Sequence, residues 1–317
     1  DDFEGSKSII DLKNGSSWFI SGTPQMFSES QLTNDLAYGF NRARLAYYTI
    51  DPLFYSKTNS ATPGHIKTDK AQLSNHYMRQ VIEQEVFPNK QVQNGAPNTL
   101  QTFDLYFNPN IRGQYNYSIS DLNADGRLNN PDKKWGGIVR RLESNDFEAL
   151  NVEFIEFWVL DPFIYNPTSA GGSLYFNLGN ISEDVLKDGR QGIENGLPAD
   201  GDLRKVDSTA WGRVPRLQAI AQSFDNNPNV RKQQDIGLDG LSTVDEQSFF
   251  KGQYLDQLKT AYGEGSAAYQ QALADPSADD YHYFRGSDLD NVKAPIIERY
   301  ARYNVTESNS KTSQQSL

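Results

Sequence analysis

The sequence of 317 residues contains no cysteine, only three histidines and only two methionines. Without cysteine the chain has no disulfide bond, no thiolate metal ligand and no cysteine nucleophile. The histidines, His65, His76 and His282, are scattered and form no pair at metal-binding spacing. These absences exclude a disulfide scaffold, a zinc-thiolate site and a thiol-dependent enzyme.

Long apolar runs and basic clusters are also missing. No segment approaches the ~20 apolar residues of a membrane-spanning helix. Acidic residues outnumber basic ones by 41 to 30, which gives a net charge of -11, and Lys and Arg form no stripe along the chain. Binding to a phosphate backbone needs such a stripe, so we expect no nucleic acid partner and no direct membrane span.

Motifs for nucleotide binding and serine hydrolysis are absent as well. No glycine-rich phosphate loop follows a predicted strand, and the G-x-S-x-G motif does not occur. The chain starts at Asp1 without an initiator methionine or a signal peptide. We interpret it as a piece of a longer protein, so the missing signal peptide predicts nothing about location.

Aromatic residues, in contrast, are abundant and make up 12% of the chain. The densest apolar stretch is WGGIVRRLESNDFEALNVEFIEFWVLDPF, residues 135–163. Along Val152–Leu160 both alternating faces are mostly apolar, which predicts an interior strand covered on two sides. Turn-forming clusters at intervals of about 8–12 residues separate it from further strand-like segments, namely 100–109, 116–122, 135–142 and 171–179. The pattern predicts a mainly β protein built as an antiparallel β-sandwich.

We predict a single sandwich domain over residues 1–305 with two insertions. The first insertion, about residues 28–95, is expected to be helical, and the second, about residues 221–280, to be rich in loops with some helix. Residues 306–317 are dominated by Ser, Gln and other polar residues, which predicts a linker or a disordered tail.

Four stretches in or near these insertions have helical composition. Asp69 or Ser74 could cap the second of them, and Pro88 lies just past its end. The predicted helices are Gln31–Thr49, Lys70–Val86, Val244–Tyr262 and Ser266–Ala274.

One loop has oxygen ligands at the spacing of an EF-hand. It is DLNADGRLNNPD, residues 121–132, and its candidate calcium ligands are Asp121, Asn123 and Asp125, the backbone carbonyl of Arg127, and Asp132. Three features oppose this interpretation: the twelfth residue is Asp rather than Glu, a proline precedes it, and the flanks are strand-like. The alternative is a polar hairpin loop with Asx-turns. Calcium is therefore the one cofactor that the sequence predicts.

A second acidic loop, QQDIGLDGLSTVDE, carries Asp235, Asp239, Asp245 and Glu246. Its spacing matches no known metal loop. The simpler interpretation is a turn followed by a helix whose N-terminus is capped by Ser242 with Asp245.

Glu153 and Glu156 lie in the predicted central strand and are the nearest approach to a glycosidase pair. Their spacing of three places them on opposite faces of a regular strand, where they cannot flank one bond. We expect Arg140 or Arg141 to pair with one of them.

Exposed aromatics such as Trp158 could stack on sugars, but core packing is the simpler role. We therefore predict that the chain is not an enzyme and that it has no catalytic residues.

Seven phrases, taken together and in order, resemble one known family. They are DDFEG (1–5), NIRGQYNY (110–117), WGGIVRRLESNDFEALNVEFIEFWVLDPF (135–163), LYFNLGNISEDVLKDG (174–189), QQDIGLDGL (233–241), ADPSADDYHYFRG (274–286) and IIERYARYN (296–304). The set is similar to the SprA/Sov family, the outer-membrane translocon of the Bacteroidetes type IX secretion system.

The resemblance implies a fragment of a very large β-barrel protein that exports folded cargo and supports gliding motility in some members. This chain lacks the long series of lipid-facing alternating strands of a barrel. It would then be a soluble domain at the periplasmic or cell-surface side of the outer membrane of a Gram-negative bacterium. Its expected partners are other secretion-system subunits and secreted cargo.

The order of DDFEG, FIEFWVLDPF and SLYFNLG further resembles the jelly-roll layout of galactose-binding and carbohydrate-binding modules. The resemblance therefore implies a jelly-roll-like sandwich with helical and loop insertions. It leaves two roles open: a non-enzymatic domain that caps or gates the pore or docks partners, and a carbohydrate-binding module, stabilised by calcium, that touches a glycan.

Overall fold

The computed structural model describes residues 10–91, 98–142, 153–190, 202–216, 237–280 and 282–304. Within these ranges every sheet has two strands, and each pair is antiparallel. The pairs are β1 (Trp18–Ile20) with β6 (Ile138–Arg140), β2 (Ala43–Tyr48) with β5 (Asp104–Arg112), β3 (Val81–Ile82) with β4 (Thr99–Leu100), and β7 (Val206–Ser208) with β8 (Arg213–Pro215).

The predicted mainly β jelly-roll sandwich is wrong. The structure is 29% helical and 15% strand, and no sheet within the described ranges is larger than a pair. The predicted central strand, Val152–Leu160, explains the error. Val152 lies outside the described residues, while residues 153–160 form no strand and, except for Leu160, are exposed. An apolar alternating pattern shows that a segment can be buried between two layers, but the described part of this chain supplies no layer to cover it.

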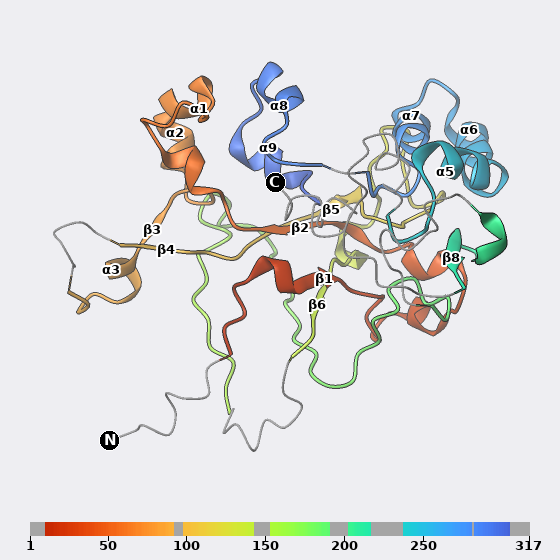
Figure 1. Ribbon diagram of the computed structural model, residues 1–317, viewed down its shortest axis with the longest axis horizontal. Helices are drawn as coiled ribbons and strands as arrows, with labels where there is room; N and C mark the ends of the chain where they lie inside the picture. The colour runs from red at the N-terminus through yellow and green to blue at the C-terminus, as the bar shows by residue number, and fades with distance from the viewer. Residues whose placement is uncertain are drawn as a thin grey trace.

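The β2–β5 ribbon runs through the middle of the molecule, with helices above it and the β1–β6 pair below it in Figure 1. All six residues of β2 are buried. The predicted helix Gln31–Thr49 is therefore wrong over its second half. Leu45, Tyr47 and Tyr48 suit a pleated strand buried on both sides, and this packing overrides a composition that is compatible with a helix.

Two hydrophobic cores lie on the two sides of β2. Ala43 and Tyr47 pack into the first, and Ala46 and Tyr48 into the second. The division follows from the period of two in a strand, which points successive side chains to opposite faces. One strand thus contributes to both cores.

Each core is organised around stacked aromatic rings. In the first, the ring centroid of Tyr117 lies 4.4 Å from that of Phe250 and 5.3 Å from that of Tyr254. In the second, the ring of Tyr300 lies 4.3 Å from Tyr48 and 4.8 Å from Phe284. The high aromatic content is therefore used for packing, as the composition indicated.

The helices of the first insertion are shorter than predicted. The predicted helix Lys70–Val86 is divided into α2 (Lys70–Leu73) and α3 (Glu83–Val86), which lie on either side of β3. Asp69 caps α2 by accepting a hydrogen bond from the Gln72 backbone N–H at 2.9 Å, so the predicted cap is confirmed. Helix α1 (Gly64–Thr68) precedes it.

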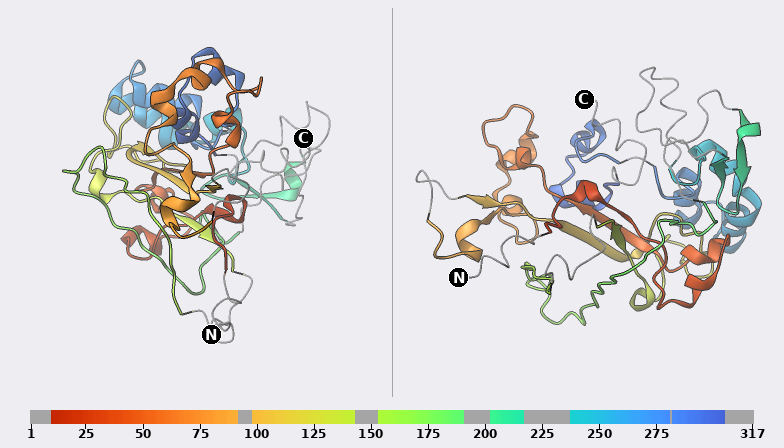
Figure 2. Two further views of the ribbon diagram at one scale, coloured as in Figure 1. Left: turned by 90° about the vertical axis from the view of Figure 1, so that its left-hand side faces the viewer. Right: turned by 60° about the horizontal axis from the view of Figure 1, so that its bottom comes forward.

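The helices after residue 242 confirm the sequence prediction. Val244–Tyr262 corresponds to α5 (Thr243–Phe249), a π-helical turn (Lys251–Leu255) and α6 (Asp256–Tyr262), and Ser266–Ala274 corresponds to α7 (Ala267–Ala274). Ser242 and Ser266 cap α5 and α7, as their positions predicted. Figure 2 shows this group at one end of the molecule.

The remaining helices are short. Helix α9 (Ile296–Ala301) packs over the second core and contacts β2, and α8 (Ser287–Asn291) precedes it. Single 3-10 turns connect the other elements: Gly15–Ser17, Ser28–Gln31, Leu36–Gly39, Pro52–Tyr55, Pro131–Lys133 and Leu203–Lys205. Among the described residues, none of the helices combines the length and the apolar character that crossing a membrane requires.

Candidate functional site

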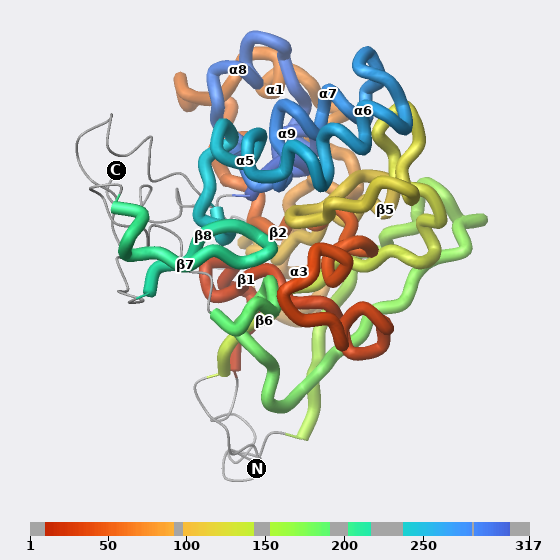
Figure 3. The backbone as a smooth tube through the Cα atoms, turned by 90° about the vertical axis from the view of Figure 1, so that its right-hand side faces the viewer, coloured from red at the N-terminus to blue at the C-terminus, as the bar shows by residue number. Residues whose placement is uncertain are grey.

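The most unusual surface of the molecule is formed by residues 153–183, called here the 153–183 segment. Every residue in it except Leu160 is exposed, and it forms no helix or strand. Large apolar side chains point into solvent, with exposed fractions of 76% for Phe154 and Trp158 and 64% for Leu174. In Figure 3 the segment runs along the outside of the molecule as a yellow-green to green coil. Contiguous apolar surface of this kind marks an interaction site.

Much of the backbone of this segment also lacks hydrogen-bond partners within the described ranges. Within the described ranges, no backbone N–H or C=O group of residues 153–160 or 172–178 takes part in a hydrogen bond. Both stretches are rich in aromatic and branched residues that favour strands. They have the composition of strands and lack the partner that a strand requires.

A turn at Pro162–Tyr165 anchors the segment to the body. The Tyr77 hydroxyl donates to the Pro162 carbonyl at 2.9 Å, and the Tyr165 hydroxyl accepts from the His76 backbone N–H at 2.9 Å. The rings of Tyr77 and Tyr165 meet edge-to-face with centroids 5.1 Å apart. Residues 153–160 precede this turn, and residues 172–178 follow it along the chain.

Few side-chain contacts hold these two stretches. The ring of Phe157 lies 5.4 Å from that of Phe176, so the two stretches approach each other there. Trp158 meets Phe87 edge-to-face at 6.5 Å and is still largely exposed. Such single ring contacts contribute about 0.5–1.5 kcal/mol each.

The charge of the segment has one sign. It carries Glu153, Glu156 and Asp161, and no Lys or Arg occurs between residues 153 and 186. The predicted pairing with Arg140 or Arg141 is wrong, since neither glutamate forms an ion pair with any described residue. Arg140 donates instead to the Asp11 carbonyl at 2.7 Å. The segment is therefore apolar and acidic.

The predicted calcium loop, residues 121–132, is a tight hairpin. Asn123 Oδ1 accepts hydrogen bonds from the backbone N–H groups of Asp125 and Arg127 at 3.0 Å each, which is the Asx-turn alternative. The Arg127 carbonyl accepts from the Asn123 N–H at 2.9 Å. Gly126 adopts a left-handed conformation with φ of 74° at the tip of the hairpin.

The two outer candidate ligands of this loop lie apart from its centre. Asp121 forms an ion pair with the buried Lys134 and accepts a hydrogen bond from Asn130 Nδ2. Asp132 is exposed in the 3-10 turn Pro131–Lys133. Calcium binding stays a prediction of the sequence pattern alone, and the geometry of the loop favours the Asx-turn alternative. In this conformation Lys134 already supplies the positive charge that Asp121 needs.

We therefore expect the melting temperature of the protein to be equal in calcium chloride and in a chelator. Lys134 neutralises Asp121, and Asn123 is engaged in the turn, so a cation gains few free ligands in this loop. Thermal melting followed by circular dichroism measures this. A calcium-dependent rise that is lost in Asp125→Asn would instead establish the loop as a calcium site.

A buried carboxyl cluster lies under α5. Oxygen atoms of Asp239, Glu246 and Asp279 lie within 4.8 Å of one another, and all three side chains are buried. Ser277 connects two of them, because its backbone N–H donates to Glu246 Oε2 at 3.1 Å and its Oγ donates to Asp239 Oδ2 at 2.6 Å. The Tyr115 hydroxyl donates to Asp279 Oδ2 at 2.8 Å.

Sequence reasoning had identified only part of this cluster. Asp239 and Glu246 were noted in the second acidic loop, whereas Asp279 lies in ADPSADDYHYFRG, far along the chain. No spacing rule connects the two loops. Asp235 lies outside the described residues, and Asp245 pairs with Arg213 at 3.2 Å instead. Only the fold brings the three carboxyls together.

Burial controls the charge of the cluster. It raises the pKa of Glu246 to about 9, with the charge of Asp239 adding to the effect. Burial likewise raises the pKa of Asp239 and Asp279 well above the usual range of an aspartate. No Lys or Arg of the described ranges forms an ion pair with any of the three. Glu246 is thus protonated at neutral pH, and the cluster is a hydrogen-bonded structural network.

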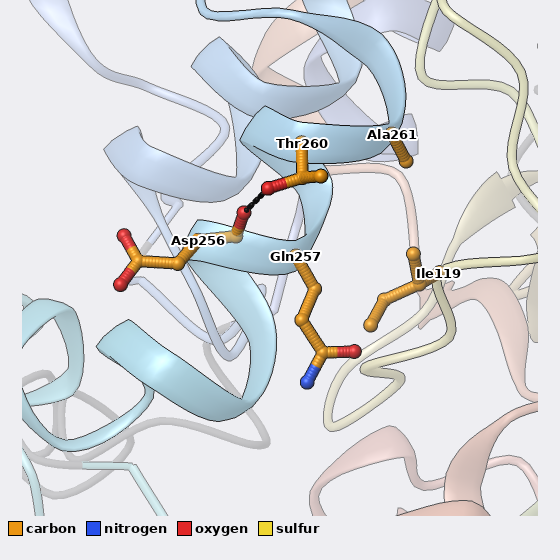
Figure 4. Close-up of a pocket in the computed structure, with 5 residues that line it drawn as sticks. All are labelled: Ile119, Asp256, Gln257, Thr260 and Ala261. Atoms are coloured by element: carbon orange, nitrogen blue, oxygen red, sulfur yellow. Dashed lines mark hydrogen bonds between the residues drawn. The ribbon is translucent and has the colours of Figure 1, made fainter.

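Among the described residues, hollows on the surface occur beside α6 and around His282. One lies beside α6 and is lined by Ile119, Asp256, Gln257, Thr260 and Ala261, with a single carboxylate (Figure 4). In the other, burial lowers the pKa of His282 to about 4, so its imidazole is neutral. Neither hollow pairs a nucleophile with a base. That the chain is not an enzyme stays a prediction.

Comparison with known proteins defines the class of the chain as a motility-related or secretion protein. Residues 253–317 match a family model, SprA_N, described as motility related/secretion protein. Among the described residues, the matched part contains α6, α7, α8 and α9. No curated protein matches the chain. Over this part of the chain the match bears out the resemblance to the SprA/Sov family.

Proposed function

We propose that this chain is a non-enzymatic part of a type IX protein-export translocon at the outer membrane, on its periplasmic or cell-surface side. In this role the 153–183 segment docks other secretion-system subunits or secreted cargo. The family match supports a setting in secretion and motility. The single observation that carries the docking role is the exposure of the apolar side chains of the 153–183 segment.

The energetics of this surface favour docking over an isolated state. Burial of apolar area contributes about 25 cal/mol per Å², and aromatic side chains each bury about 150–250 Å². Phe154, Phe157 and Trp158 are all more than half exposed, so most of this gain is still available to a partner. The segment is anchored to a folded body, because Tyr77, whose hydroxyl donates to the Pro162 carbonyl, packs against the second core.

A carbohydrate-binding role is the second candidate, because Trp158 and Tyr175 are 76% and 60% exposed. Exposed aromatic rings of this kind can stack on sugar rings. A glycan array distinguishes the two roles. Glycan binding that disappears in Trp158→Ala, with unchanged stability, would favour the module over the docking surface.

The test of the docking role is a secretion assay in a bacterium that carries the gene. We expect Trp158→Asp combined with Leu178→Asp to lower secretion at least about tenfold, since charges in the centre of an interface remove hot-spot contacts. The abundance of the protein should stay unchanged, because exposed substitutions alter the free energy of unfolding by less than about 0.5 kcal/mol.

The matched control is Val244→Asp combined with Val292→Asp, which places the same two charges at residues that are each 71% exposed. This variant should secrete normally. Normal secretion by the Trp158 and Leu178 variant would contradict the proposed function.

A further inference from the structure

We propose that residues 153–160 and 172–178 are docking edges to which a partner protein adds an extended strand of alternating apolar and basic side chains. This inference rests on the proposed function and gives the partner its chemistry. Three independent observations support it: the unpaired backbone, the arrangement of the apolar side chains, and the charge of the segment.

The unpaired backbone selects an extended partner. Residues 153–160 make no backbone hydrogen bond within the described ranges, although they are rich in strand-forming residues. Exposed N–H and C=O groups along an extended segment are the template for strand addition. A helix laid on this surface would leave those groups unpaired, because its own backbone bonds are internal.

The side chains provide an apolar surface on both sides of such a strand. With a period of two, Phe154 and Trp158 share one side, while Ile155, Phe157 and Val159 share the other. Cross-strand pairs of aromatic and branched residues contribute about 0.2–1 kcal/mol each. The partner strand therefore gains most when its own side chains are apolar at alternate positions.

The acidic charge of the segment indicates which side chains the partner strand carries between its apolar positions. Glu153, Glu156 and Asp161 are exposed, and no basic residue lies between residues 153 and 186. Lysine or arginine at alternate positions of the added strand would face Glu153 and Asp161, which share one side of residues 153–161. A second copy of the chain would bring the same carboxylates and its own net charge of -11, so like charges oppose self-pairing. An anionic membrane surface is opposed for the same reason.

The experiment uses the full chain and synthetic ten-residue peptides labelled with a fluorophore. We expect a peptide of alternating valine and lysine to bind at least about tenfold more tightly than one of alternating valine and glutamate, and added salt to weaken the binding. N-methylation of alternate peptide amides should abolish binding, because it removes the strand's donors. Hydrogen exchange of the protein amides at 153–160 and 172–178 should slow in the complex.

Charge reversal in the protein provides the specific variant. Glu153→Lys with Glu156→Lys should reverse the preference, so that the valine–glutamate peptide binds more tightly. The matched control is Asp125→Lys with Asp132→Lys, which changes the net charge equally at two other exposed acids and should leave the preference unchanged.

Several results would overturn the inference. They are no binding of the valine–lysine peptide at millimolar concentration, equal binding of both peptides, binding without protection of these amides, or a dimer in sedimentation that buries the segment. If secretion still depends on Trp158 and Leu178 after such a result, the proposed docking function is kept and the inference of strand addition is rejected. If secretion does not depend on them, the proposed function fails whatever the peptides do.

Discussion

The free energy of unfolding should fall as the pH rises from about 4.5 to about 9, and Glu246→Gln should remove much of this dependence. Burial raises the folded-state pKa of Glu246, so between these values the folded protein holds a proton that the unfolded chain has released. Stability from this group is complete below its unfolded pKa and is lost as the pH rises toward the folded one. Each such group changes the free energy by about 1.4 kcal/mol per pH unit.

Urea unfolding at a series of pH values measures this slope. In Glu246→Gln the amide oxygen still accepts from the Ser277 N–H, so the hydrogen bond is kept while the titration is lost. The variant should therefore be more stable than the wild type at pH values near the folded pKa. Glu156→Gln, at an exposed position, is the control and should leave the slope unchanged. Equal slopes for Glu246→Gln and the wild type would contradict the buried, protonated state.

Arg299→Met should destabilise the protein by about 3–5 kcal/mol, because it removes a buried guanidinium and leaves three acceptors without their donor. The guanidinium of Arg299 is buried and donates to the Ala294 carbonyl at 2.9 Å, the Phe284 carbonyl at 3.2 Å and Asp290 Oδ1 at 2.6 Å. Methionine fills the volume and replaces none of these bonds. Arg302→Met, at an exposed arginine close by, should cost less than about 0.5 kcal/mol.

The midpoint of denaturant unfolding reports both changes. Similar midpoints for Arg299→Met and Arg302→Met would show that the three acceptors find other partners. The comparison also tests α9 within the family-matched region, since Arg299 ties this helix to the segments before it.

Local signals predicted local structure well. The helix after Ser242 was predicted because a capping residue and a suitable composition coincide there, and both act within one turn. Helix α7 was predicted from its composition. The strands Asp104–Arg112 and Ile138–Arg140 overlap segments predicted as strands from their strand-like composition between turn-forming clusters. The family was also recognised from the sequence, and the match at residues 253–317 confirms it.

Predictions that depended on distant partners failed. Residues 153–160 have the pattern of a covered strand, but the pattern does not say where the covering layer comes from, and no described segment provides it. Gln31–Thr49 was predicted as a helix because its pairing with β5, far along the chain, has no local signal. The carboxyl cluster needs Asp279 from a third loop, so spacing could not reveal it.

The position of β2 between the two cores bears on how the protein resists unfolding under mechanical force. Ala43 and Tyr47 pack into the first core, and Ala46 and Tyr48 pack into the second, so the same strand is part of both cores. If either core unfolds, one face of β2 becomes exposed to solvent while its other face still belongs to the remaining core. The two cores therefore cannot unfold independently, and a force applied to one core acts through β2 on the other.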